Sequence, residues 1–342
     1  MGKEKMRNKE IAEILHITPA AVSMALNNKG GVSESKRKKI FELKYASSQS
    51  PEEKEKKKGR ILFFIHVKNG NVIAETHFFV TLMSAIQERA GYYGYFADII
   101  RYDSKTQFRE FISSVNMSNV CGILVLATEI DSEDAALYRD LGKPLVMIDN
   151  WFAGEDYDCI LMDNIDGIKQ AVRYACHMEH RNIGFVRSKI HIHNFDERYE
   201  GFCQGMREAG LPIIRKNIFS TKCTTDGAYE DMCAIIKKTP ELPSLLIISN
   251  DVMAIGIVNA LKYSHYRVPK DVSVISFDNM PIARYFSPTL TTVSIQDKQI
   301  GYVSVDRLIE KIEKGMDNYF VHNLIGVRLE IRESVCNYSS MR

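Results

Sequence analysis

Polar side chains stand directly after several apolar runs of this 342-residue sequence, at places where a buried strand would end. Asp149 follows "PLVMI", Asn250 follows "SLLIIS" and Asp278 follows "VSVISF". Because the carboxyl ends of parallel strands meet at one edge of a sheet, these side chains can converge on one cleft. A carboxylate accepts hydrogen bonds from two hydroxyls, and an amide both accepts and donates. The pattern therefore predicts a site for a small polar molecule with vicinal hydroxyls, such as a sugar.

Two more residues fit that chemistry. Arg198, in "DERYEGF", offers a planar fork of hydrogen-bond donors, and Trp151, the only tryptophan, lies two residues past Asp149. An indole ring can stack on the apolar face of a sugar. Each of these residues also has a structural interpretation, because strand-end acids often cap helices and a lone tryptophan often only packs in a core.

No arrangement typical of catalysis occurs. His191 and His193 in "HIHNF" have no cysteine or carboxylate at a metal-ligand spacing, and no G-x-S-x-G, P-loop or G-x-G-x-x-G motif is present. We therefore expect no catalytic residue, no metal site and no cofactor, and we expect that the protein is not an enzyme.

The elements that must position these residues alternate regularly after residue 60. Short continuous apolar runs such as "ILFFIHV", "CGILVLA" and "NIGFVRS" alternate with helical patterns such as "FFVTLMSAIQERAGYYG" and "VMAIGIVNALKYS". This rhythm is typical of parallel α/β sheets with helices on both faces. Its length predicts two doubly wound parallel-sheet lobes with a ligand cleft between them, one formed by residues 60–162 with 293–320 and the other by 163–292 with 321–334. Chain crossings are expected near 161–164, 290–294 and 320–323, and a tail at 335–342.

The amino-terminal residues 1–47 predict a small all-α helix-turn-helix domain. Asn8 can cap a first helix, and Thr18 can cap a second that has Pro19 in its first turn, where a missing N–H costs nothing. Ser33 can cap a third. The apolar positions of the three helices form one buried stripe each: Ile11, Ile14 and Leu15; Val22, Ala25 and Leu26; Ile40, Phe41 and Leu43. Residues 48–59, with "KEKKKG", predict a polar linker.

Charge separates the two parts of the chain. Residues 1–60 hold 15 Lys and Arg against 8 Asp and Glu, whereas the remainder holds 30 against 35. A basic head on a mildly acidic body favours nucleic acid as a partner. The seven scattered cysteines are typical of reduced thiols, and no apolar segment has the length of a signal peptide core or a membrane span. We expect a cytoplasmic, nucleoid-associated protein with no membrane partner.

The segment "IAEILHITPAAVSMALNN" followed by "VSESKR" resembles the DNA-binding headpiece of the Lac-repressor family. The resemblance implies that the second helix enters the major groove of a double-stranded operator, with Ser23 and Asn27 on phosphates. The residues that it assigns to DNA are Thr18, Pro19, Ala20, Ala21, Ser23, Met24, Asn27, Ser33 and Arg37.

The headpiece departs from the family in two ways. Ala21 and Met24 offer few donors to base edges, so we expect mainly apolar contact with thymine methyl groups. The stretch "SSQSPEEKEKKKG" contains no clear counterpart of the family's minor-groove hinge helix, and Lys54, Lys56, Lys57 and Lys58 can act on phosphates instead.

The body also resembles the periplasmic-binding-protein-like effector domain of that family, through "DERYEGF", "ISNDVMAIGIVNAL", "VPKDVSVISFDN" and "SPTLTTV". The resemblance implies an effector site that includes Asp149, Arg198, Asn250 and Asp278, to which we add Trp151. It further implies a homodimeric repressor of carbohydrate uptake or catabolism genes that responds allosterically to a sugar. Two alternatives within the class are a nucleobase effector and a phosphorylated partner protein, and a plain solute-binding protein is a third possibility.

Overall fold

The computed structural model describes residues 11, 12, 15, 17–26, 40, 58–68, 70, 78–104, 106–239, 241–315 and 319–341. The chain divides into two compact units, Met1–Lys58 and Gly59–Arg342, and we describe each by itself.

The first unit contains the predicted second helix, α2, at Pro19–Leu26. Thr18 caps it as expected, because the Ala21 amide donates to Thr18 Oγ1 over 3.2 Å. Its inner face packs in a small core with flanking residues: Ile11, Ala12, Val22, Ala25 and Ile40 are buried, and Leu15 and Ile17 pack against them. The stripe residues that are described, Ile11, Leu15, Val22, Ala25 and Ile40, lie in this core as predicted, whereas the side chain of Leu26 lies outside the description. The predicted roles of Asn8, Ile14, Ser33, Phe41 and Leu43 lie outside the described residues.

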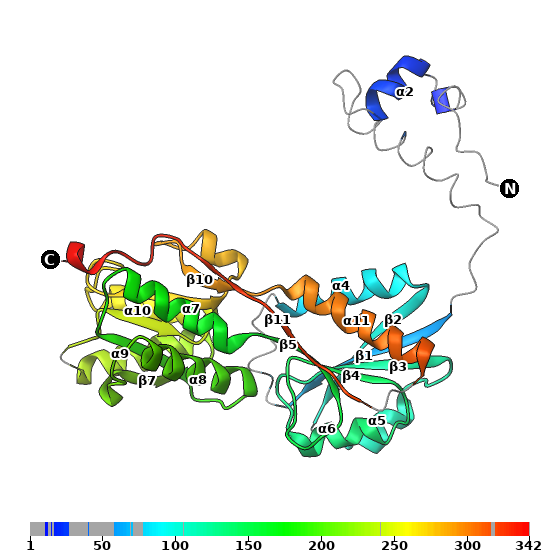
Figure 1. Cartoon of the computed structure of the whole chain (residues 1–342), viewed down its shortest axis with the longest axis horizontal. Helices are drawn as coiled ribbons and strands as arrows, with labels where there is room; N and C mark the ends of the chain where they lie inside the picture. The colour runs from blue at the N-terminus through cyan, green and yellow to red at the C-terminus, as the bar shows by residue number, and fades with distance from the viewer. Residues whose placement is uncertain are drawn as a thin grey trace. The chain divides into compact units, whose positions relative to one another are not determined.

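The second unit consists of two sheets, each flanked by helices (Figure 1). The first sheet has the strand order β11-β5-β4-β3-β1-β2, and all of its neighbours are parallel. Its strands are β1 (Gly59–Val67), β2 (Tyr95–Asp103), β3 (Val120–Leu126), β4 (Leu145–Ile148), β5 (Asp158–Met162) and β11 (His322–Ile325).

The second sheet repeats this plan with the order β12-β10-β9-β8-β6-β7. Its strands are β6 (Ile183–Ser188), β7 (Ile218–Thr221), β8 (Leu245–Ile248), β9 (Ser273–Asp278), β10 (Thr291–Ser294) and β12 (Arg328–Glu330). The chain winds outward in both directions from a switch point in each sheet, β1/β3 in the first and β6/β8 in the second. Ligands of such sheets bind beyond the carboxyl ends of the strands near that point. The predicted fold class is confirmed.

Alternate residues of each central strand face two helical layers. In β1, Ile61 and Phe63 join the core under α4 and α11, whereas Leu62 and Phe64 face α5 and α6. Figure 1 shows these two helical pairs on opposite faces of the first sheet. The first-lobe helices are α4 (Phe78–Tyr92), α5 (Phe108–Ser114), α6 (Ser132–Arg139) and α11 (Asp297–Lys314). The second-lobe helices are α7 (Asn164–His177), α8 (His193–Glu208), α9 (Thr225–Lys238) and α10 (Asp251–Tyr263), with short 3₁₀ turns at Arg215–Asn217, Pro281–Arg284 and Tyr338–Met341. Within the described ranges, no helix combines the length and apolar character needed to cross a bilayer.

Three chain segments connect the lobes, and two of our predicted boundaries require correction. The crossing after β5 lies at residue 163, within the predicted range, but the second follows β10 at 295–296 and the third follows β11 at 326–327. Residues 322–325 therefore belong to the first sheet, where β11 pairs with β5, and not to the second lobe. In addition, β12 pairs antiparallel with β10, so the second sheet is not wholly parallel.

A buried carboxylate holds the returning chain to the first lobe. Asp158, at the start of β5, is fully buried and accepts from Arg307 Nε at 3.0 Å and from the Val321 amide at 2.8 Å. Lys311, on the same helix as Arg307, also pairs with it. One carboxylate thus ties α11 and the segment that leads into β11 to the strand beside it.

Replacing Asp158 by asparagine removes the buried negative charge that Arg307 and Lys311 share, so we expect the free energy of unfolding to fall by about 3 kcal/mol. Urea denaturation followed by circular dichroism measures the loss. Glu310→Gln is the matched control, because Glu310 pairs with the same Arg307 at 2.9 Å but lies at the surface, where loss of a pair costs under about 1 kcal/mol. Equal losses in the two variants would contradict this explanation.

Candidate functional site

Four of the five predicted effector residues line one cavity between the lobes. Asp149 follows β4 of the first lobe. In the second lobe, Arg198 lies on α8, Asn250 lies two residues past β8, and Asp278 ends β9. The open volume among them is only about 40 Å³. The other lining residues are Phe78, Phe79, Thr128, Met162, Ile192, Asn194, Phe195 and Ile295. Polar groups of both lobes therefore converge on a narrow space with aromatic walls.

Arg198 is the most connected side chain of this cavity. It is 3% exposed, and its Nε donates to Asn164 Oδ1 at 2.9 Å while Nη1 donates to the Ser249 carbonyl at 2.7 Å. Its Nη2 lies 3.1 Å from Asp278 Oδ1, and the guanidinium lies over the Phe277 ring at 3.8 Å. The donor fork expected to bind a ligand is thus already engaged by groups of the second lobe and by Met162 Sδ of β5, which lies 3.4 Å from Nη2.

Close helix packing sets the position of Arg198. A Cβ added at Gly201 of α8 would lie 2.8 Å from the Ile165 carbonyl oxygen of α7, so only glycine permits this approach of the two helices. Because α8 lies so close to α7, the Arg198 guanidinium reaches Asn164 at the start of α7.

Asp278 and Asn250 complete the second-lobe side. Asp278 has a backbone φ of 104°, in a region that non-glycine residues seldom occupy, and such strain often accompanies functional sites. Burial raises the pKa of its carboxyl, and the neighbouring Arg198 opposes that rise. Asn250 also has a structural role, because its Oδ1 caps α10 by accepting from the Met253 amide at 3.0 Å.

Asp149 is the polar group that the first lobe contributes from β4. Its backbone φ is 75°, and its Oδ2 accepts from Thr128 Oγ1 at 2.5 Å. Its Oδ1 is buried and has no hydrogen-bond partner among the described residues. Burial raises the pKa of this carboxyl to about 6, although Thr128, Asn194 and Arg198 favour the charged form. An uncompensated carboxylate oxygen beside a cavity is a natural acceptor for a ligand donor.

Asp251, next to Asn250, has a structural role instead. Its carboxylate accepts from Ser276 Oγ, from Thr292 Oγ1 at 2.8 Å and from the Met280 amide at 2.7 Å. Burial raises its pKa to about 7, and the nearby charge of Asp278 adds to the rise. These bonds fix the turn that follows β9 and so hold Asp278 at the cavity.

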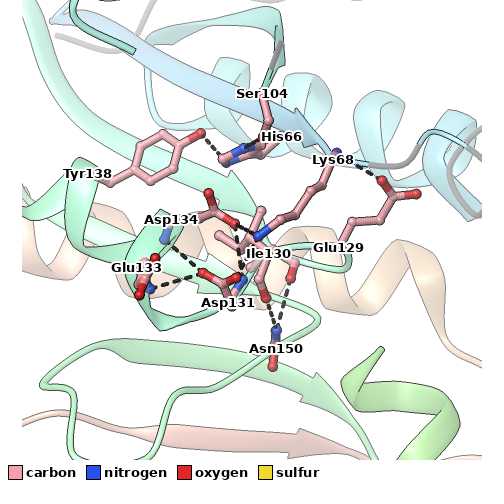
Figure 2. A network of polar contacts seen from close by, with 11 residues as sticks. His66, Lys68, Ser104, Glu129, Ile130, Asp131, Glu133, Asp134, Tyr138 and Asn150 are labelled. Atoms are coloured by element: carbon pink, nitrogen blue, oxygen red, sulfur yellow. Dashed lines mark hydrogen bonds and ion pairs between the residues drawn. The ribbon is translucent and has the colours of Figure 1, made fainter. Parts of the chain in front are cut away.

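Trp151 does not line this cavity. It lines a separate, larger chamber of about 420 Å³ to which both lobes contribute, and it is 37% exposed. Figure 2 shows the first-lobe wall of that chamber, where Lys68 Nζ lies between Asp131 Oδ2 at 2.5 Å and Asp134 Oδ2 at 2.7 Å. Glu129 Oε2 accepts from the backbone amides of Lys68 and Gly70.

A buried histidine lies behind this wall. His66 Nε2 is 2.7 Å from Ser104 Oγ, and its Nδ1 is 3.1 Å from the Tyr138 hydroxyl (Figure 2). Burial lowers the pKa of His66 to about 4, so the ring is neutral at pH 7. His66 therefore stabilises the end of β1 through hydrogen bonds to Ser104 and Tyr138 and adds no charge to the chamber.

Several lining residues were not predicted from the sequence. Thr128 follows the run "GILVLA", so the rule that found Asp149 would also have found it, and Lys68 follows β1 in the same way. By contrast, Asn194, Phe78 and Phe195 lie in the first turns of helices, and no local pattern marks them. Among the described residues, no three or more His, Cys, Asp or Glu side chains are placed so that they could hold a metal ion.

In the first unit, α2 turns a largely apolar surface outward. Thr18, Pro19, Ala20 and Met24 are exposed, and Ala21 and Ser23 are half-buried. Val22 and Ala25 are fully buried on the opposite face. The residues predicted to face DNA therefore share one outward face as far as they are described, and Asn27, Ser33 and Arg37 lie outside the described residues.

Two α/β lobes with polar groups converging between them have the fold of a periplasmic binding protein-like domain. A family model for a periplasmic binding protein-like domain matches residues 172–335. Among curated relatives, the HTH-type transcriptional repressor PurR of Glaesserella parasuis is 27% identical over 313 residues, which cover 90% of each chain.

Solved structures show the same fold. The cellobiose complex of the regulator CelR matches with a TM-score of 0.72 at 20% identity and covers 96% of this chain and 99% of that one. The Lac repressor dimer bound to operator and the anti-inducer ONPF matches with a TM-score of 0.69 at 19% identity, covering 97% and 100%. The family model, the curated repressors and these structures together support a transcriptional regulator of the Lac-repressor family rather than an enzyme.

The buried Asp149 should make stability depend on pH. Unfolded, this carboxyl titrates near 3.8, and folded it titrates near 6, so the folded state holds the proton more tightly between these values. Stability is therefore lost as the pH rises through that window, by about 3 kcal/mol for this group. We expect Asp149→Asn to flatten the fall in the free energy of unfolding between pH 4 and 7.

Urea titrations at several pH values measure that slope. Glu241→Gln, at an exposed position, is the control and should retain the wild-type slope. An unchanged slope in the Asp149→Asn variant would show that the carboxyl ionises normally in the folded protein.

Proposed function

We propose that this protein is an operator-binding transcriptional repressor whose DNA affinity depends on a small uncharged ring compound bound between its lobes, with a sugar as the first candidate. The observation that carries the proposal is the buried Asp149 Oδ1, which has no hydrogen-bond partner among the described residues. It lines a cavity shared with Arg198, Asn250 and Asp278 of the opposite lobe. A ligand hydroxyl or ring N–H would satisfy it.

A nucleobase is the second candidate effector. Carboxylates accept from ring N–H groups as readily as from hydroxyls, and the aromatic Phe78 and Phe195 can contact a flat ring. The curated relatives named PurR favour a purine, whereas the cellobiose complex of CelR favours a sugar. Thermal unfolding with glucose, ribose, cellobiose, adenine, guanine and hypoxanthine separates the two, because only a ligand of the native state raises its stability.

The effector would act by linking the lobes. It would bridge Asp149 to the Arg198 group across a boundary that the chain crosses at residues 163, 295–296 and 326–327. Differences in lobe closure would then alter the spacing of two headpieces in a homodimer on a pseudo-palindromic operator. Such coupling is typically about 1–3 kcal/mol.

Asp149→Asn tests this link. The change keeps the side-chain shape and suits the positive φ, but it replaces one carboxylate oxygen by a donor that repels a ligand donor. We expect at least about a tenfold loss of ligand affinity, since a buried unpaired donor costs roughly 1–3 kcal/mol. Operator affinity without ligand should be unchanged.

Fluorescence anisotropy of labelled operator, with and without the ligand found by thermal unfolding, measures both quantities. Arg198→Ala is a poorer choice, because it also leaves Asp278 buried without a counter-charge and threatens the fold. A variant that still responds fully to ligand would exclude Asp149 from the effector site.

The headpiece would recognise DNA through α2. Its exposed Pro19, Ala20 and Met24 supply apolar contact, which suits thymine methyl groups in the major groove, and Thr18, Ser23 and the basic residues of the first 60 positions supply phosphate contact. Affinity should then fall steeply with salt, whereas sequence preference should depend on few side chains.

Met24→Ala tests the apolar contact. The side chain is 37% exposed and is not part of the headpiece core, so the fold should persist. We expect operator affinity to fall about tenfold, since a lost base contact costs roughly 1–3 kcal/mol, while affinity for unrelated DNA stays constant. Anisotropy titrations on both DNAs give the ratio. An equal fall on both would show that Met24 has no part in base recognition.

A further inference from the structure

The first turn of α8 meets the first lobe at the loop that follows β4. His193 and Asn194 begin α8 in the second lobe, and Asp149 and Trp151 belong to the β4 loop. The His193 ring meets the Trp151 indole edge-on, with the ring centroids 5.9 Å apart. Beside this contact, Asn194 interacts with the Asp149 carboxylate. Neither pair belongs to a segment where the chain crosses between the lobes, so both contacts exist only while the lobes are close together.

Trp151 is fixed within the first lobe. The buried Asn150 donates from Nδ2 to the carbonyls of Ala127 and Ile130, at 3.1 and 3.0 Å, and its Oδ1 accepts from the Trp151 amide at 2.8 Å. The His322 ring, at the start of β11, lies beside the same indole with a centroid distance of 5.6 Å. An indole held in this way cannot follow the second lobe when the lobes separate, so separation breaks its contact with His193.

His193 is joined to the polar groups around Arg198. Its Nε2 lies 3.1 Å from Glu197 Oε1, one turn later in α8, although the two atoms are not aligned for a hydrogen bond. Glu197 Oε2 accepts from Asn164 Nδ2 at 3.0 Å, and Asn164 Oδ1 accepts from Arg198 Nε at 2.9 Å. Burial acts to raise the pKa of Glu197, but its contacts with these neighbours outweigh that effect and lower the pKa below its usual value. A charged Glu197 therefore connects the ring at the boundary to the buried guanidinium.

The same contacts reach the first chain crossing. Asn164 is the first residue of α7 and directly follows the crossing at residue 163. A change in the relative position of the lobes must turn the chain at this point, one residue from a side chain that is bonded to both Glu197 and Arg198. The position of His193 at the boundary is thereby tied to the segment about which the lobes move.

We propose that the Trp151–His193 contact stabilises the closed arrangement of the lobes in the absence of any ligand. An aromatic pair of this geometry favours the state that contains it by roughly two- to tenfold. The contact thus sets the balance between closed and open lobes before an effector binds. It concerns the lobes alone and requires no particular effector. Only its consequence for operator affinity rests on the proposed function, which couples lobe arrangement to DNA.

The distance between the lobes tests the proposal. Spin labels carried by unnatural residues in place of Glu133 on α6 and Glu200 on α8, both exposed, measure that distance by pulsed electron paramagnetic resonance (Figure 1). Labelled chains are diluted with unlabelled chains, so that distances between two copies do not contribute. In the ligand-free protein we expect His193→Ala to raise the ratio of the longer to the shorter distance roughly two- to tenfold. His193→Phe keeps a ring against the indole and should stay near the wild type.

His322→Ala is the matched control, because it uncovers the same indole from within the first lobe. Since Trp151 is the only tryptophan, acrylamide quenching of its fluorescence reports the local exposure in each variant. Both alanine variants should increase the quenching, but only His193→Ala should change the distance between the lobes. Circular dichroism establishes that each variant is folded.

An unchanged distance distribution in His193→Ala, or an equal change in His322→Ala, would overturn the proposal. Operator affinity without ligand, measured by fluorescence anisotropy on the same variants, separates this outcome from failure of the proposed function. If His193→Ala changes the distances but not the operator affinity, the contact between the lobes stands and the coupling of the lobes to DNA fails.

Discussion

The site depends on one buried cation. Arg198 is almost completely removed from water, and a buried guanidinium is tolerated only when its donors and its charge are satisfied. It meets this need with groups from three elements: Asn164 at the start of α7, the Ser249 carbonyl after β8 and Asp278 at the end of β9. The arrangement that satisfies one side chain thereby fixes the relative positions of the strand ends that line the cavity.

Neighbouring contacts hold the residues around Arg198 in place. Asp251 fixes the turn after β9 through hydrogen bonds from Ser276, Thr292 and the Met280 amide. Gly201 allows α8 to lie close to α7, which keeps Arg198 within reach of Asn164. The strained backbone of Asp278 persists because these neighbours over-determine it. On the second-lobe side of the cavity, the charged groups are therefore paired and most hydrogen-bonding groups have partners before any ligand binds.

The sequence predicted the parts of this design that follow from local periodicity. Asp149, Asn250 and Asp278 could be found because each ends a continuous apolar run, and the Thr18 cap of α2 could be found because Pro19 follows it. Contacts between residues far apart in the sequence could not be predicted in this way. The assignment of β11 to the first sheet depends on its ladder with β5, and the engagement of Arg198 depends on a helix crossing.

Trp151 illustrates the same limit. It stands two residues after Asp149, and sequence proximity placed both in one site. In the structure, Asn150 turns the chain between them by binding the Ala127 and Ile130 carbonyls, so that the acid lines the inner cavity and the indole the outer chamber. The hydrogen bonds of the buried Asn150 side chain thus place Asp149 and Trp151 in different cavities. No pattern in the sequence predicts these hydrogen bonds.

The contrast between the lobes bears on how binding free energy can be used. On the first-lobe side, Asp149 is short of a partner and its pKa is raised to about 6, whereas the second-lobe groups already satisfy one another. A ligand that only replaced existing second-lobe bonds would gain little and would favour neither lobe arrangement. One that also satisfies Asp149 gains most when the lobes are close enough for it to touch both. Its affinity then differs between arrangements of the lobes, and that difference is what an allosteric response requires.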